Sequence, residues 1–453
     1  METLNNIVLT IQNYMSNYVL IIALLGAGLW FSFRLGFIQV RGFGEGMRRT
    51  FGGLFSKKGE AGADGMSSFQ ALATAIAAQV GTGNIAGAAT ALAIGGPGAI
   101  FWMWIAAFLG MATIYAEAIM AQKYKTVGAD GQVTGGPVYY IRAAFKGTFG
   151  KVLAGIFAIL ITLALGFMGN AVQSNSIAAS FHTAFGIPQW IMGLVVAVIA
   201  IFVFMGGMKR IAKVTETIVP LMAALYIIGS LIVIIYNYKN IPYAFASIFI
   251  GAFSPSSVVG GAAGATVKLA LTKGVARGLF SNEAGMGSTP HAHAVAKVDH
   301  PVEQGFVAMT GVFIDTFVVL NLTALVILTT KSIPSGKTGA ELSQYAFSTL
   351  YGKGGDIFVA ICMFFFAFST IIGWYFFGQA NIKYLFGPKA VKIYSVVAAV
   401  CVFLGSLAEV DLVWNMADCF NSLMVVPNIL ALFALSKVIS QVHEDYFKKK
   451  NNS

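Results

Sequence analysis

The chain has 453 residues, of which 57% are hydrophobic and only 10% are charged. Soluble proteins carry roughly 25% charged residues, so the composition excludes a disordered chain, a secreted disulfide scaffold and an ordinary cytosolic enzyme. The formal net charge of +11 would fit a nucleic-acid partner, but the placement of the basic residues indicates none. The cysteines lie in apolar runs, which indicates packed thiols rather than a disulfide or zinc framework: Cys362, Cys401 and Cys419.

Long apolar runs recur along the chain, and each is predicted to form a transmembrane helix, because about 20 apolar residues span a bilayer. The first run does not read as a cleaved signal peptide, since Glu2 and no basic residue precede it. The predicted fold class is an all-α polytopic membrane protein. Its eleven spans are expected at 16–34, 66–93, 98–122, 150–180, 188–206, 213–237, 262–290, 303–330, 355–381, 390–407 and 411–440.

The basic residues concentrate in alternate loops between these spans. If the loop after the first span is cytoplasmic, 22 of the 29 Lys and Arg residues lie on that side and four on the other. Three more fall in the seventh span: Lys268, Lys273 and Arg277. By the positive-inside rule, the chain is predicted to cross the cytoplasmic membrane with its N-terminus outside and its C-terminus inside.

An internal repeat relates the two halves of the chain. Spans two and seven both contain Asn-x-Ala-Gly, and the offset of 198 from Asn84 to Asn282 also takes Glu117 to Asp315. Five spans separate the copies, so the copies have opposite orientations. The pattern predicts a five-plus-five inverted repeat preceded by one extra helix.

Both copies of the motif lie in glycine-interrupted spans, which predicts two broken helices facing one cavity. A helix breaks at membrane depth only where its freed backbone groups find partners. The half-helix beyond Gly81, Thr82 and Gly83 would offer N–H groups to a carboxylate, and the carbonyls before it suit a small cation. A glycine-rich packing face is the alternative reading of span two.

Several segments of the sequence resemble those of a known protein family. Residues 95–105, Gly-Gly-Pro-Gly-Ala-Ile-Phe-Trp-Met-Trp-Ile, resemble the signature of the alanine/glycine:cation symporters, also called sodium:alanine symporters. The segments 80–84 and 281–285, and the Ala-His-Ala at 292–294, resemble the same family. The resemblance extends from about residue 16 to 440.

The resemblance implies a LeuT-like fold and sodium-driven uptake of D- or L-alanine and glycine, with no enzymatic activity. The expected parts are an extra helix and basic loop at 1–60, the repeats at 66–237 (core helices one to five) and 262–440 (core helices six to ten), and a cytoplasmic tail at 441–453. The expected partners are the substrate, sodium and the lipid bilayer, and a monomer is expected to suffice.

The LeuT-like pattern also implies the substrate residues. Its Gly-x-Gly-Asn matches 81–84, so the amides of Thr82 and Gly83 are expected to hold the substrate carboxylate. Polar side chains at membrane depth complete the polar set, and bulky aromatic residues would close a small pocket. These further residues are Gln79, Gly81, Asn170 and Ser281, with Phe167, Phe280 and Trp374 as the aromatic wall.

The same resemblance implies a sodium site where core helix one meets core helix eight. Carbonyls of Ala77 and Val80 and the hydroxyls of Ser369 and Thr370 would form an oxygen shell for a hard cation. The two hydroxyls could instead only bond backward to carbonyls of their own helix. Asn84 and Asn282 are less certain members of the site.

Intramembrane charges need partners. Glu117 and Asp315 are interpreted as structural anchors near helix ends, with a role in the cation path as the alternative. Asp418 is a candidate gate, and Glu283 is expected to pair with Arg277 or Lys273.

Three other functions were weighed against sodium symport. A metal-dependent membrane enzyme could use the cluster His291, His293, Asp299 and His300, but a hydrated loop is the favoured reading. A channel is disfavoured because channels favour symmetric oligomers. Proton coupling is the closest alternative; related proton-driven carriers use a lysine in core helix five, and span six has none after Lys213, at its edge.

Overall fold

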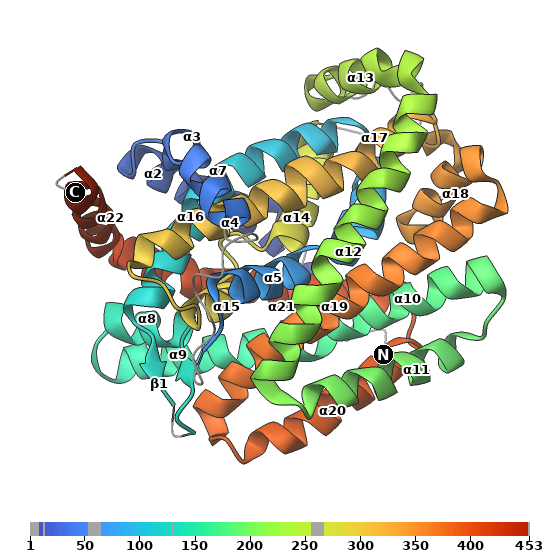
Figure 1. Ribbon diagram of the computed structural model, residues 1–453. Coiled ribbons are helices and arrows are strands. Elements are labelled where there is room, and N and C mark those ends of the chain that lie inside the picture. The colour runs from blue at the N-terminus through green and yellow to red at the C-terminus, as the bar shows by residue number, and fades with distance from the viewer. Residues whose placement is uncertain (1–8, 12–13, 53–64, 129, 255–266, 452–453) are drawn as a thin grey trace.

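The computed structural model describes residues 9–11, 14–52, 65–128, 130–254 and 267–451, and these residues are mostly helical (Figure 1). Lys57, Lys58 and residues 262–266 of the predicted seventh span lie outside the described residues. The α-helices are α2 (Leu20–Arg34), α3 (Ile38–Arg41), α4 (Phe43–Gly52), α5 (Ser68–Gln79), α6 (Ala88–Gly95), α7 (Gly98–Lys123), α8 (Pro137–Ala144), α9 (Gly147–Ile161), α10 (Asn170–Phe185), α11 (Gln189–Phe204), α12 (Gly207–Tyr236), α13 (Ile241–Phe253), α14 (Val267–Asn282), α15 (Pro290–Ala294), α16 (Pro301–Val312), α17 (Asn321–Thr329), α18 (Gly339–Tyr351), α19 (Lys353–Phe386), α20 (Ala390–Gly405), α21 (Val410–Ala434) and α22 (Ser436–Asn451).

Short stretches of other structure join these helices. Wider π-helical turns continue three of them: η3 (Gly83–Gly87) leads into α6, η4 (Thr162–Gly169) joins α9 to α10, and η7 (Phe313–Leu320) joins α16 to α17. Another, η1 (Met15–Val19), precedes α2, and single 3₁₀ turns form η5 (Tyr238–Asn240) and η8 (Ile333–Ser335). The strands β1 (Thr126–Val127) and β2 (Val133–Thr134) pair antiparallel. Because π-helical turns are frequent at functional sites, we expect functional residues near η3, η4 and η7.

Six helical segments of the described chain are long and apolar enough to cross a bilayer: 98–123, 147–185, 207–236, 301–329, 353–386 and 413–434. Four other predicted spans coincide with apolar helices of 10–17 residues. The count of eleven spans therefore stays a prediction. Outward-facing apolar side chains on α11 and α20 fit a lipid-facing surface, among them Leu194, Val198, Phe202, Val397 and Leu404.

The helices form two packed groups with α5 between them. Helices α7, α14 and α16 pack on one another, and α10, α11, α19 and α20 form the second group. Helix α5 contacts α16 of the first group and α19 of the second, and Figure 1 shows it near the centre of the molecule. Residues on α5 can therefore contact both groups of helices.

Helix α5 begins and ends at clear local signals. Ser67 and Gln70 form a capping box, with Ser67 Oγ accepting from Gln70 N–H over 3.1 Å. Such reciprocal capping satisfies the first free amides of a helix. The helix ends where Val80 adopts ψ 85°, one residue before the first glycine of the break.

The glycine–proline–glycine signature at 96–98 serves packing. Gly96 has φ 71°, which favours glycine, and α7 starts directly after Pro97. A Cβ on Gly98 would lie 2.1 Å from the carbonyl oxygen of Gly251, so α13 can press onto α7 only because this residue is glycine. The surface helix α13 and the helix α18 were expected as loops between spans.

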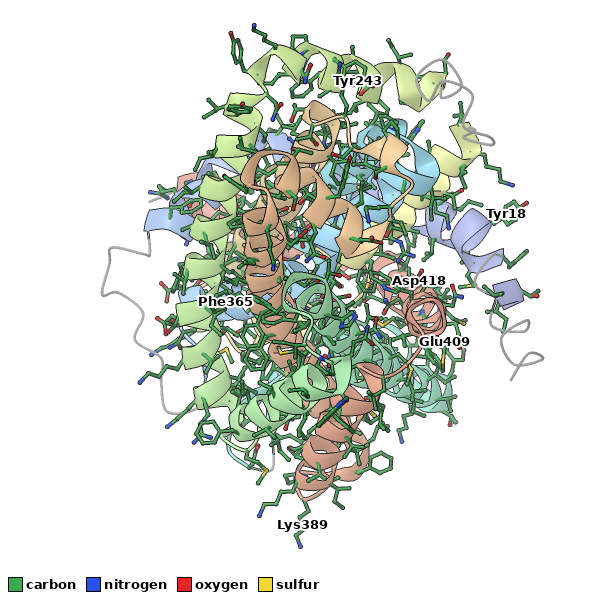
Figure 2. All side chains as sticks on the ribbon, turned by 90° about the vertical axis from the view of Figure 1, so that its right-hand side faces the viewer. Tyr18, Tyr243, Phe365, Lys389, Glu409 and Asp418 are labelled. Atoms are coloured by element: carbon green, nitrogen blue, oxygen red, sulfur yellow. The ribbon has the colours of Figure 1, made fainter. Side chains whose placement is uncertain are left out.

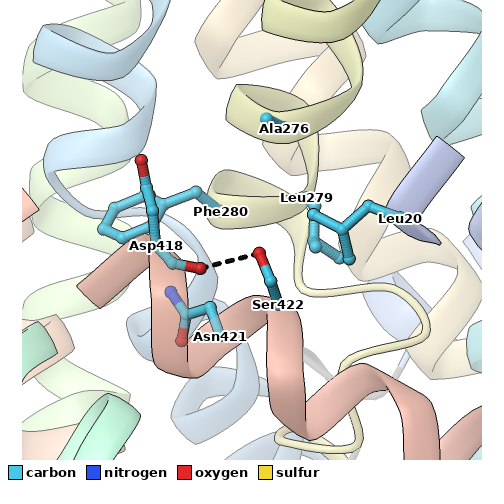
Figure 3. A pocket seen from close by; sticks show the side chains of 7 residues that line it. All are labelled: Leu20, Ala276, Leu279, Phe280, Asp418, Asn421 and Ser422. Carbon is cyan, nitrogen blue, oxygen red and sulfur yellow. Dashed lines mark hydrogen bonds between the residues drawn. The ribbon is translucent and has the colours of Figure 1, made fainter. Parts of the chain in front are cut away.

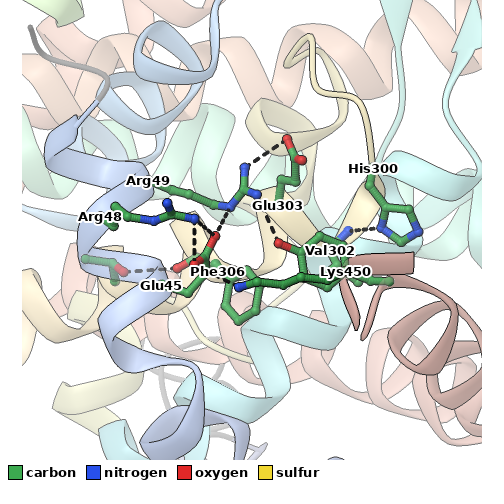
Figure 4. A network of polar contacts seen from close by, with 10 residues as sticks. Glu45, Arg48, Arg49, His300, Val302, Glu303, Phe306 and Lys450 are labelled. Carbon is green, nitrogen blue, oxygen red and sulfur yellow. Dashed lines mark hydrogen bonds and ion pairs between the residues drawn. The ribbon is translucent and has the colours of Figure 1, made fainter. Parts of the chain in front are cut away.

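At one end of the molecule a network of charges joins three segments (Figure 4). Glu45 of α4 accepts from Arg48 and Arg49, and Arg49 pairs with Glu303 of α16 over 3.1 Å. Lys450 of α22 reaches Glu45 over 3.3 Å. Burial alone would raise the pKa of Glu45, but these hydrogen bonds and charges outweigh it and lower the pKa to about 2. The acid therefore stays ionised at neutral pH and holds α4 against α22.

Candidate functional site

The first helix break lies between α5 and η3, at residues 80–82. Gly81 N–H donates to Asn84 Oδ1 over 3.0 Å, and Thr82 N–H donates to Gln173 Oε1 on α10 over 3.1 Å. All of these residues are buried, Val80 included. The amides of the break therefore have side-chain partners, as a break at membrane depth requires.

Three of the residues predicted to bind sodium, Ala77, Ser369 and Thr370, are brought together where α5 passes α19. Thr370 Oγ1 lies 2.7 Å from the carbonyl oxygen of Ala77, and Ser369 Oγ lies 3.5 Å from it. Both hydroxyls also donate backward to the carbonyl of Phe366, over 3.0 and 2.9 Å. The hydroxyls therefore contact both the carbonyl of Ala77, as a sodium site requires, and a carbonyl of their own helix. A cation bound here could replace the hydroxyl protons as the partner of the Ala77 carbonyl oxygen.

Gly81 fits against this pair with no room for a side chain. A Cβ on Gly81 would lie 2.3 Å from Thr370 Oγ1 and 3.1 Å from Gln173 Oε1. Real Cβ atoms do not approach so closely, so the glycine is needed for α5 to reach α19.

The second break follows α14. Glu283 has φ 58°, a left-handed conformation that is unusual for a residue with a side chain. Its carboxylate is held by Trp374 Nε1 and Ser288 Oγ. The prediction that Glu283 pairs with Arg277 or Lys273 is wrong, because Arg277 instead binds Asp418 on α21 and no ion pair of the described residues joins Lys273 to Glu283. Indole and hydroxyl donors hold Glu283 in place.

The two breaks touch each other. Gln79 Nε2 donates to the carbonyl of Asn282 over 2.7 Å. A Cβ on Gly83 would lie 3.0 Å from Ser281 Cα and 3.3 Å from Phe280 Cδ1. The backbone cradle predicted at 81–83 is therefore bounded by the second break, because Gln79 and Gly83 lie directly against residues 280–282.

Asp315 joins the breaks through its carboxylate. It lies in η7, midway along the helical segment 301–329, so the expectation of an anchor near a helix end is wrong for this residue. Its oxygens accept from Asn84 Nδ2 over 2.7 Å, from Ser281 Oγ over 2.9 Å and from Thr316 Oγ1 over 2.9 Å. Asp315 is fully buried, and within the described residues no ion pair reaches it. All three donors are neutral, so the structure supplies hydrogen bonds but no opposite charge.

Glu117 plays the matching part from the other half of the chain. Its carboxylate accepts from the backbone N–H groups of Gly285 and Gly287 over 3.1 and 3.0 Å, and from Asn428 Nδ2 over 2.6 Å. The acid of the first half thus holds the second break, and Asp315 of the second half holds the first.

The aromatic wall forms around Trp374 and Phe280. Their rings meet perpendicularly with centroids 5.6 Å apart, and a Cβ on Gly169 would lie 2.5 Å from the Trp374 ring. Phe167 instead packs against Tyr394, at 5.7 Å between centroids. No described contact of Phe167 reaches the breaks, so Phe167 is not part of the aromatic wall around Trp374 and Phe280.

Gln173 reaches the break, whereas Asn170 does not. Asn170 Nδ2 donates back to the carbonyl of Gly166 over 3.2 Å, as a helical asparagine commonly does. Gly169 packs on Trp374, and Gln173 lies four residues later on the same helix face.

Two residues of the predicted loop cluster, His291 and His293, are not in a hydrated loop, whereas Asp299 and His300 do lie in the loop before α16. His291 and His293 are both 1% exposed on α15. His291 contacts Ser288 O and Asn381 Nδ2, and His293 contacts Gln304 Oε1. Within the described residues, no group of three or more His, Cys, Asp or Glu side chains is placed to hold a metal ion.

Phe280 is also one of the residues that line a small pocket. It holds about 10 Å³ and lies between α2, α14 and α21, with Asp418, Asn421 and Ser422 on one side (Figure 3). Ser422 Oγ donates to the Asp418 carbonyl over 2.7 Å. Such a volume matches roughly one water molecule, so the pocket is too small to hold a substrate.

Comparison with known proteins places this geometry in context. A family model described as the sodium:alanine symporter family matches residues 1–453. The chain is 42% identical over 440 residues to the sodium/alanine symporter AgcS of Methanococcus maripaludis, covering 96% of this chain and 95% of that protein. It is 40% identical to a putative sodium/proton-dependent alanine carrier protein of Bacillus subtilis, covering 94% and 89%.

Solved structures show the same fold at low sequence identity. A Na⁺-coupled sialic acid symporter in a substrate-bound outward-open state superposes with a TM-score of 0.57 at 14% identity, covering 94% of this chain and 86% of that chain. The LeuT-like arrangement of a mostly helical chain is therefore confirmed.

Proposed function

This chain belongs to the sodium:alanine symporter family, and on that premise we propose that it couples uptake of alanine and glycine to a sodium gradient. Either enantiomer of alanine is included in the proposal. The membership makes it a multi-pass membrane transporter.

The contact of Thr370 with Ala77 carries the proposal. A sodium ion at this contact would take oxygens from Ala77 and Val80 on α5 and from Ser369 and Thr370 on α19. Hard cations prefer such oxygen ligands. Helix α5 contacts both packed groups and α19 belongs to the second, so an ion held between α5 and α19 would fix the first break against the second group.

The substrate carboxylate belongs at the first break. Gln173 Nε2 and Thr82 Oγ1 are buried polar atoms without a hydrogen-bond partner among the described residues. A carboxylate lying against Gly83 could accept from both and from the free end of η3. Unmade hydrogen bonds of buried groups are costly, so these two atoms favour a polar ligand at this place.

Asp315 supplies the negative charge that the ligands require. One sodium ion and one zwitterionic alanine bring one net positive charge into the protein. The carboxylate of Asp315 would offset it, since a buried charge is tolerated only with a partner. Asn84 connects Asp315 to Gly81, so the acid is joined by one residue to the break at the sodium contact.

Phe280 and Trp374 limit the substrate to a small side chain. The two rings, together with Ser281 behind Gly83, leave little space at the cradle. Alanine and glycine fit this description, whereas a branched or aromatic side chain would have to displace a ring.

Transport follows from the two packed groups of helices. Sodium and substrate each favour the arrangement in which the breaks are ordered, so each raises the affinity for the other by the same factor. The group containing α7, α14 and α16 would then rock against the group containing α10, α11 and α20, and open the site to the other side. The repeat boundaries at 66–237 and 262–440 and the orientation with the N-terminus outside remain part of this proposal.

The function can be tested with purified protein in liposomes. An inward sodium gradient should drive accumulation of alanine, and a potassium gradient of the same size should not. Glycine should compete with alanine, and leucine should not. Accumulation driven by potassium, or by no ion, would contradict the proposed coupling.

Replacing Thr370 by alanine should weaken the sodium response. Contacts to a charge contribute about 1.5–3 kcal/mol, so the sodium concentration for half-maximal uptake should rise roughly 10- to 100-fold. Maximal uptake at saturating sodium should change little. The measurement is uptake against sodium concentration.

Two further variants separate this effect from general damage. Thr370→Ser keeps the oxygen and should stay near wild type. Thr162→Ala removes a buried hydroxyl that donates only to its own helix, at the carbonyl of Ala158, and should leave the sodium response unchanged. An unaltered sodium response in Thr370→Ala would remove this residue from the site.

Proton coupling is the second candidate, because one relative is named as sodium/proton-dependent. Its sequence signal would be a lysine on α12 at the sodium contact. Lys213 of α12 is exposed, and the buried polar residue of α12 near this place is Thr215, 3.1 Å from Thr74 of α5. The described structure therefore favours sodium.

A further inference from the structure

An ion pair and two aromatic rings form a column above the cradle. Arg277 of α14 binds Asp418 of α21 through two parallel contacts of 3.0 and 2.9 Å. The guanidinium carbon lies 4.6 Å from the centre of the Trp414 ring, and that ring lies 4.8 Å from Phe280. Phe280 in turn bounds Gly83, so the column joins Arg277 to the proposed substrate position.

Arg277 also borders a cavity of about 460 Å³. Helices α6, α10, α14 and α21 and the start of α18 enclose it, at the right-hand end of the molecule in Figure 1. Figure 2 looks onto this end, with Glu409 and Asp418 labelled on it. Ligand pockets commonly measure about 300–1,000 Å³, so a small amino acid with its water would fit.

The chemistry of the lining favours a carboxylate. Lys273 and Arg277 both face the cavity, and its one acidic residue, Glu341, is paired with Lys337. Arg277 is only 9% exposed, yet its Nε has no hydrogen-bond partner among the described residues. A buried donor beside a cavity requires an acceptor from outside the chain, and a guanidinium matches the geometry of a carboxylate.

We propose that this cavity is a first binding station for the substrate, which is recognised by its α-carboxylate. The incoming carboxylate takes the place of Asp418 on the guanidinium of Arg277, and Lys273 attracts it into the cavity. Release of Asp418 frees Trp414 and Phe280 to swing away from Gly83. The inference rests on the proposed amino-acid transport and adds to it the residues that capture the substrate.

The test is the rate at which alanine associates with the purified, sodium-loaded protein, followed by stopped-flow tryptophan fluorescence. Lys273→Gln removes a cavity charge that makes no ion pair with another described residue, and should lower the association rate constant about three- to tenfold with an unchanged dissociation rate. Lys268→Gln is the matched control, because Lys268 is an exposed base on the same helix that does not line the cavity.

Asp418→Asn should change the association rate of alanine in the opposite direction and increase it. Without its competing carboxylate, Arg277 accepts the substrate more readily, so both association and dissociation should become at least threefold faster. A plain gate without a binding station predicts this change too, but predicts no effect of Lys273→Gln. Equal association rates for Lys273→Gln and the wild type would therefore overturn the inference.

Two further experiments test the ligand class and the proposed function separately. Exchange of chloride for isethionate should leave the association rate unchanged; an increase would show that chloride occupies the cavity and would overturn the carboxylate assignment. Sodium-dependent binding of alanine by the wild type is measured first. Its absence would refute the proposed function, whereas its presence with unaffected rates in the variants would refute only the binding station.

Discussion

Gly81→Ala is expected to reduce sodium-dependent alanine uptake by roughly 10- to 100-fold. The new Cβ would lie 2.3 Å from Thr370 Oγ1 and 3.0 Å from Thr370 Cβ, so Thr370 would have to move off the carbonyl of Ala77. The sodium contact and the first break would both be distorted by one methyl group. Overpacking a protein core typically costs about 1–3 kcal/mol, and a free-energy cost of this size corresponds to the expected loss of uptake.

The control for this variant lies six residues along the same segment. A Cβ on Gly87 would meet its nearest neighbours at 3.9 and 4.0 Å, which is ordinary contact. Gly87→Ala should therefore keep near-normal uptake and thermal stability. Adding Thr370→Ala to Gly81→Ala should cost little more than Gly81→Ala alone, since both changes act on one contact. Uptake by Gly81→Ala with a normal sodium dependence would contradict the site.

Asp315→Asn is expected to weaken sodium-dependent binding of alanine by more than about 100-fold. The substitution keeps the size of the side chain but removes the charge proposed to offset sodium and substrate. It also places an NH₂ group among three donors, from Asn84, Ser281 and Thr316. Breaking a buried charge arrangement typically costs about 3–5 kcal/mol, which supports a loss of this size.

The measurement is calorimetric or fluorescence titration of alanine at several sodium concentrations. Asp356→Asn is the control, because Asp356 is an acid at the start of α19 that accepts from Ser348 Oγ over 3.0 Å, away from both breaks. It should bind alanine normally. Normal binding by Asp315→Asn would mean that a neutral side chain suffices at this position, and the charge argument would fail.

Much of the fold could be predicted from the sequence because the bilayer leaves few choices. Uniform apolar runs place the long helices, and glycine at 81, 83 and 285 marks the breaks. The connecting helices α13 and α18 could not be predicted as such. The 13 residues of α13 are mostly apolar but too few to span a bilayer, and α18 mixes aromatic with polar residues, which fits a loop as well as a helix.

The site could be predicted in part. The residues of α5 and α19 at the sodium contact follow from motifs, and the structure brings Ala77 and Thr370 together. Which polar residue of α10 reaches the break could not be derived. Asn170 and Gln173 both lie in an apolar helix, and only the packing of Gly169 on Trp374 reveals the inward face.

The choice of partner for a buried charge was also beyond the sequence. Arg277 lies nearer to Glu283 in the chain, yet it pairs with Asp418, 141 residues away. The turn of the second break directs Glu283 toward Trp374 and Ser288 instead. Distances along the chain do not indicate pairing once a helix is broken.

The most direct test of sodium coupling at the contact of α5 and α19 is equilibrium binding of alanine to the purified protein in sodium, potassium or choline at one fixed pH. The account predicts tight binding in sodium alone, with affinity rising with sodium concentration. Equal binding in all three salts, with a response to pH instead, would contradict it and favour proton coupling.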